Sequence, residues 1–183
     1  MTNENKIKED ILFIKNTFKE MRNKTEHFSK DRDFTMSNPQ LFTFLYNVPA
    51  ALSIASDGTV DEIEIAIIEK LARSIDVNKT VNINLLEMMS IAPEPDNCMT
   101  NEEFNLRVGS ELLFLSRNMQ KYERDFIEGI KALLKFDKHP EKDGSMTSAL
   151  NKLMEFVIEN NAGRNKEKEL LKVKEYKKRI GIK

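Results

Sequence analysis

Apolar residues recur along most of the chain with the three- and four-residue spacing of α-helices. The first stripe is spaced by four, three, four, three and seven residues, and consists of Ile7, Ile11, Ile14, Phe18, Met21 and Phe28. It predicts an amphipathic helix over residues 4–29, packed on its own domain rather than on a second copy. Further helices are predicted over 41–55, 59–76, 82–92, 101–136, around 150–158 and over 166–179. No segment shows the alternation of a β-strand.

These segments predict an all-α fold, a bundle of about seven helices. A chain of 183 residues suits one domain, which we expect to span 1–183. Within it, 1–30 forms the N-terminal amphipathic helix, 40–160 the core and 164–183 a basic C-terminal helix.

Sequence signals also mark where helices begin and bend. The pattern Thr59-Val-Asp-Glu62 predicts a capping box that begins a helix, and Thr100-Asn-Glu-Glu103 predicts a second one. Pro49 is expected to bend the helix over 41–55. The predicted helix over 101–136 is long, so Gly109-Ser110 is expected to kink it.

Glu64 stands out because a helical wheel places its carboxylate inside an apolar arc, between Leu71 and Ile75. A carboxylate there has to be hydrogen-bonded, neutralised or coordinated. One interpretation is that Glu64 accepts hydrogen bonds from the Asp57-Gly58 turn. The other is that Asp57, Asp61 and Glu64 hold a hard cation, Mg²⁺ or Ca²⁺. The spacing does not match an EF-hand loop.

Composition excludes several classes of chemistry. The chain has one cysteine and two histidines, too few for an ordinary zinc site, and no glycine-rich phosphate loop. The lone Cys98 cannot form an intrachain disulfide, and the first residues are polar, so we expect a cytoplasmic location. Residues 41–55 are too short and too polar to span a bilayer. No catalytic residue is assigned, although a hydrolase or sensor using Asp57, Asp61 and Glu64 stays open.

Basic residues gather near the end of the chain, where 164–183 holds nine Lys or Arg and three Glu. The candidates for contact with an anionic partner are Lys172, Lys174, Lys177, Lys178 and Arg179. A membrane surface or nucleic acid is an alternative partner for this segment. A solvated helix is the interpretation we favour, because glutamates interrupt the run.

The stretch from Ala50 to Glu64, a helix followed by D-G-x-x-x-x-x-E, resembles the hallmark of the TerB-like family of tellurite-resistance proteins and DnaJ-like co-chaperones. The resemblance covers residues 40–92 and rests on Asp57, Gly58 and Glu64. It implies an all-helical core with a related second half, where Asp143-Gly144 precedes another helix and Leu150 replaces the glutamate.

The resemblance also gives an expectation about function. It implies a non-enzymatic protein-interaction module in a cytoplasmic assembly, related to stress or defence, that binds a protein partner. It is also compatible with a bound divalent cation.

Overall fold

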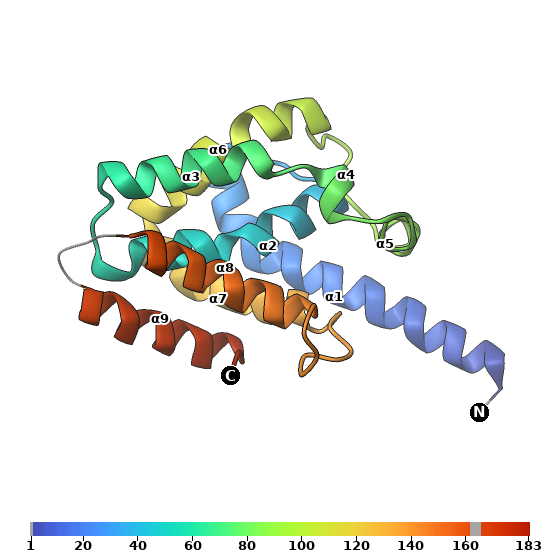
Figure 1. The fold of residues 1–183 in the computed structure, drawn as a ribbon. Coiled ribbons are helices and arrows are strands. Elements are labelled where there is room, and N and C mark those ends of the chain that lie inside the picture. Colours follow the sequence, from blue (N-terminus) through green and yellow to red (C-terminus); the bar gives the residue numbers. More distant parts are fainter. Residues whose placement is uncertain (1, 162–165) are drawn as a thin grey trace.

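Every regular element in the described residues, 2–161 and 166–183 of this computed structural model, is helical (Figure 1). Within these ranges nine α-helices and one short 3-10 helix follow in the order α1 (Asn3–Arg32), α2 (Asn38–Ile54), η1 (Ala55–Asp57), α3 (Glu62–Ser74), α4 (Val77–Thr80), α5 (Ile83–Met89), α6 (Asn101–Arg117), α7 (Met119–Leu134), α8 (Met146–Asn160) and α9 (Lys166–Ile180). The all-α prediction is confirmed. The described helices outnumber the predicted seven because α4 was not predicted and because the segment 101–136, predicted as one helix, forms both α6 and α7.

Helix α2 forms the centre of the bundle. Fifteen of its 17 residues are buried, which means that neighbours cover it on every side. Those neighbours include α6, α7, α8 and α9. A helix that is apolar all round is stable in water only in such a position. Ser37 and Gln40 form a capping box at its start, and Pro49 lies inside it.

Helix α1 packs along α7, but its first part extends away from the bundle (Figure 1). The apolar stripe is buried from Ile14 to Phe28. Ile7 is 52% exposed, so the predicted packing of the whole stripe on its own domain holds only for the later residues.

Two predicted helix boundaries are wrong. Helix α3 begins at Glu62 and is capped by Asp61, not Thr59, because Thr59 donates to the Asp57 carboxylate instead. The segment 101–136, predicted as one long helix with a kink at Gly109-Ser110, is two helices: α6 runs through Gly109 and ends at Arg117, because Asn118 leaves helical geometry with φ −120° and ψ 22°. The capping box at Thr100 and Glu103 is confirmed.

Gly109 has a different role, which is to let α6 approach α3. A Cβ atom at this position would lie 2.7 Å from the Cβ of Ala72. Real Cβ atoms do not approach so closely, and the atom in the way belongs to a short side chain that cannot move aside. The close contact holds the later part of α3 against α6.

We predict that Gly109→Ala lowers the free energy of unfolding, measured by urea denaturation, although alanine favours helices. Overpacking costs typically about 1–3 kcal/mol, which exceeds the roughly 1 kcal/mol gained in helix propensity. Exposed Ser110→Ala is the control and should change stability by less than about 0.5 kcal/mol.

A second substitution isolates the contact itself. Combining Gly109→Ala with Ala72→Gly removes the clash. The double variant should therefore lose less free energy of unfolding than the two single variants lose together. Additive effects would show that the two helices are not in tight contact here.

Candidate cation site at the junction of three elements

The turn between α2 and α3 fixes the first carboxylate of the site. Gly58 follows η1 with φ +84°, a conformation that glycine adopts without strain. The Oδ1 atom of Asp57 accepts hydrogen bonds from the backbone N–H and the hydroxyl of Thr59, both at 2.9 Å. These contacts orient Asp57 at the end of η1.

Glu64 lies in the first turn of α3 and is 1% exposed, so the predicted burial is confirmed. Its Oε2 atom accepts from the backbone N–H of Asp61 at 2.9 Å, and Asp61 Oδ1 accepts from the N–H of Glu64 at 2.9 Å. This reciprocal pair is a capping box. The backbone partner of Glu64 is therefore the first residue before its own helix, rather than the turn at Asp57.

The third carboxylate, Glu169, comes from α9 and was not predicted as a site residue. It is 1% exposed. The sequence does contain a signal for its burial, because the buried positions of α9 recur with the helical spacing of four, three and four residues. They are Glu169, Val173, Tyr176 and Ile180. The apolar members of that stripe imply that the glutamate also points inward.

Asp57, Glu64 and Glu169 meet so closely that one oxygen of each lies within 4.8 Å of the others. Asn161 links two of them, since its Nδ2 donates to Glu64 Oε1 at 2.7 Å and to Glu169 Oε1 at 3.2 Å. The buried Oε2 atom of Glu169 receives no hydrogen bond from an N–H or hydroxyl donor of the described residues. Asp61 is not one of these three residues, and its side chain caps α3 instead.

The pKa values of the two buried carboxyls reflect this crowding. Burial raises the pKa of Glu64 to about 7, and the negative charges of Asp61 and Asp57 act in the same direction. The hydrogen bond from the backbone N–H of Asp61 acts in the opposite direction. Burial, then the charge of Asp57 and a side-chain hydrogen bond shared with Asp57, also raise the pKa of Glu169, while Lys166 acts in the opposite direction. Near neutral pH the cluster needs a proton or a cation to offset its negative charge.

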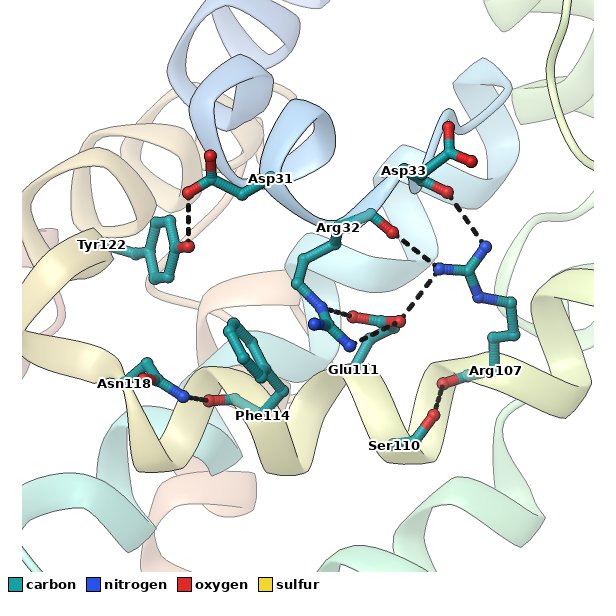
Figure 2. Close-up of polar contacts among 9 residues, drawn as sticks. All are labelled: Asp31, Arg32, Asp33, Arg107, Ser110, Glu111, Phe114, Asn118 and Tyr122. Atoms are coloured by element: carbon teal, nitrogen blue, oxygen red, sulfur yellow. Dashed lines mark hydrogen bonds and ion pairs between the residues drawn. The ribbon is translucent and has the colours of Figure 1, made fainter.

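Another buried carboxylate, Glu111, shows how the same chain neutralises such a group with side chains (Figure 2). Arg32 Nε donates to Glu111 Oε2 at 2.8 Å, and Arg107 Nη2 donates to Oε1 at 3.0 Å. Arg107 also donates to the carbonyls of Arg32 and Asp33 at the end of α1, both at 2.9 Å. Two guanidinium groups thus compensate one carboxylate, whereas three carboxylates meet at Asp57, Glu64 and Glu169.

The second Asp-Gly turn shares a left-handed glycine with the first, but α8 begins two residues after Gly144 whereas α3 begins four residues after Gly58. Gly144 has φ +81°, and Ser145 caps α8 directly after it. Asp143 Oδ1 accepts from Lys152 Nζ at 2.6 Å, and Leu150 is fully buried. Leu150, which follows Asp143 by seven residues as Glu64 follows Asp57, thus carries an apolar side chain in place of a carboxylate.

The predicted anion-binding residues are largely engaged within the molecule. Lys172 pairs with Glu175 at 3.2 Å, and Lys177 pairs with Glu155 at 3.3 Å. Arg179 Nη1 lies 2.5 Å from Glu123 Oε1. Lys174 and Lys178 are exposed. The basic segment therefore carries less available positive charge than its composition indicates.

The cysteine and the histidines lie apart from the carboxylate group. Cys98 donates to the carbonyl of Pro95, His27 lies beside Asp31 and Asp125, and His139 lies beside Glu141. The ligands offered by the described cluster are therefore oxygen atoms alone.

Comparison with known proteins gave no match to the chain among family models, curated proteins or solved structures. In the part of the chain that the structure describes, no helix combines the length and the apolar character needed to cross a membrane.

We predict that, in EDTA, the free energy of unfolding falls as the pH rises from about 5 to 8. The pKa of Glu64 is about 7 in the folded protein against an ordinary 4.5, so over this range the folded state holds a proton that the unfolded state has lost. The stabilisation is complete below the unfolded value and is lost as the pH passes the folded value. At about 1.4 kcal/mol per pKa unit, the loss is up to roughly 3 kcal/mol.

Urea denaturation at four pH values measures this dependence. Glu64→Gln should reduce the slope, and the exposed control Glu69→Gln should keep it. A wild-type stability that stays level or rises between pH 5 and 8 would contradict the buried-carboxylate argument.

For the basic segment, we predict only weak binding of the full chain to DNA or to anionic vesicles at physiological salt, because Lys172, Lys177 and Arg179 already pair with carboxylates. Fluorescence anisotropy and vesicle sedimentation measure it. Sub-micromolar binding that disappears in a Lys174→Glu, Lys178→Glu variant would assign these residues an anionic partner.

Proposed function

We propose that the chain is a non-enzymatic helical protein-interaction module of a cytoplasmic assembly, completed by a divalent cation at Asp57, Glu64 and Glu169. The observation that supports the cation is the buried Oε2 atom of Glu169, which receives no hydrogen bond from an N–H or hydroxyl donor of the described residues and lies in a group of three carboxylates. Leaving a buried charged oxygen unpaired is costly, and a cation removes that cost.

The donor atoms favour a hard cation. Mg²⁺ and Ca²⁺ prefer carboxylate oxygens, whereas Zn²⁺ sites are commonly built from histidine and cysteine. Three carboxylates supply up to three negative charges, enough to hold one divalent ion. Asn161 fixes one oxygen of Glu64 and one of Glu169, which orients both side chains for a shared ligand.

The burial of the site supports a structural role over a hydrolytic one. A metal-dependent hydrolase has to admit both water and substrate to its ion. Glu64 and Glu169 are each 1% exposed, and Asp57 is only partly exposed. Large apolar side chains that remain exposed, such as Ile83 (74%), Leu106 (79%) and Leu171 (69%), offer contact points for a protein partner.

The sequence resemblance of residues 40–92 to the TerB-like family supports the same proposal. It associates the Asp57-Gly58 turn and Glu64 with assemblies of stress response or defence. The lone Cys98 is in keeping with a reducing compartment.

We predict that CaCl₂ or MgCl₂ raises the melting temperature above its value in EDTA at pH 7.5. A cation at about 100 times its Kd stabilises by about 2.7 kcal/mol, which corresponds to roughly 5–10 °C for a chain of this size. Differential scanning calorimetry measures the rise. Glu64→Gln and Glu169→Gln should each remove most of it.

Asp61→Asn separates the site seen in the structure from the set expected from the sequence. Asparagine also caps helices well, so this variant keeps the start of α3. If Asp61 is not a ligand, the cation should still raise the melting temperature of Asp61→Asn. A wild-type melting temperature that is equal in EDTA and in both cations would remove the ion from this account.

A further inference from the structure

The three carboxylates join two parts of the chain that are far apart in sequence. Asp57 and Glu64 belong to the turn between α2 and α3, and Glu169 belongs to α9. Helix α9 packs on η1 and also contacts α2, α7 and α8. Figure 1 shows α9 along one side of the bundle. A ligand shared by these carboxylates therefore links α9 to the rest of the molecule.

The later half of α9 is held by ordinary contacts. The hydroxyl of Tyr176 donates to Glu123 at 2.8 Å, and Arg179 donates to the same carboxylate. Lys177 pairs with Glu155 on α8 at 3.3 Å. Tyr176 and Ile180 are also buried, so this half combines apolar burial with attraction between opposite charges.

The first half of α9 is held differently. Its buried side chains are Glu169 and Val173, while Leu170 is 39% and Leu171 is 69% exposed. Glu169 faces the carboxylates of Asp57 and Glu64, so when all three groups are charged the contact is repulsive. A divalent cation between them turns the same contact into an attraction.

We propose that a divalent cation staples the first half of α9 to the turn between α2 and α3, so that cation binding and the docking of this half-helix are coupled. The inference rests on the cation site proposed above. Because coupling is reciprocal, anything that lifts α9 from the bundle weakens the site, and loss of the cation loosens α9. The cation concentration would thereby control whether the inner face of this segment is covered.

Hydrogen exchange of the full chain, followed by mass spectrometry at pH 7.5, tests the coupling. If opening of α9 releases the cation, protection of its amides should grow by the factor 1 + [cation]/Kd, which is about tenfold at ten times the Kd. We expect this increase in residues 166–175, with CaCl₂ or MgCl₂ compared against EDTA. Amides in α6, which contributes no ligand, should change little by comparison.

Two variants sharpen the test. Glu169→Gln removes both the ligand and the repulsion, so in EDTA its α9 amides should exchange more slowly than those of the wild type, and cation should have little further effect. The matched control is Glu167→Gln, an exposed neighbour on the same helix, which should behave as the wild type.

Titration calorimetry on the same samples separates the two proposals. Cation binding with unchanged exchange in 166–175 would overturn the staple and leave the site standing. Equal slowing of exchange in α6 and α9 would also overturn it, since the cation would then stabilise the fold as a whole. Absence of binding would overturn the site and the staple together.

Discussion

Three carboxylates, Asp57, Glu64 and Glu169, share one small and mostly buried volume, and the rest of the molecule brings them there. Hydrophobic packing alone would not select this arrangement, because acidic groups lose hydration on burial and repel one another when charged. The cluster is therefore tolerable only when protons or a cation neutralise it. That requirement makes the junction between α9 and the turn between α2 and α3 sensitive to its ionic surroundings, unlike the apolar contacts elsewhere in the bundle.

The scaffold around the cluster is ordinary by comparison. Helix α2 is buried on all sides and leads into η1, which ends at Asp57. The capping box of α3 holds Glu64, and the close approach of Gly109 to Ala72 keeps α3 against α6. Each of these devices stabilises a helix or a helix crossing in its own right. Their combined effect is to hold two carboxylates beside Glu169 of α9.

The sequence predicts the helices well because their apolar residues recur with the helical period, and it predicts the burial of Glu64 from the same pattern. It misplaces the start of α3, since both T-x-x-E and D-x-x-E match a capping box and only the fold shows that Thr59 turns to Asp57. It predicts one helix over 101–136 with a kink at Gly109, where the glycine instead allows the close contact with Ala72, because a glycine in a helical pattern can serve either role. The sequence does not single out Glu169, because α9 is rich in lysine and glutamate and only the spacing of Glu169 with Val173 and Tyr176 marks it as buried.

Whether protons or a cation neutralise the cluster is decided most directly by crystallography. Crystals grown with CaCl₂ at pH 7.5, with diffraction data collected at a long wavelength, would reveal the ion by its anomalous signal. The account predicts a peak between Asp57, Glu64 and Glu169, with carboxylate oxygens about 2.3–2.6 Å away. A cluster without such a peak, with Asp57 and Glu169 joined by a short hydrogen bond, would show that protons do this work and would contradict the cation site.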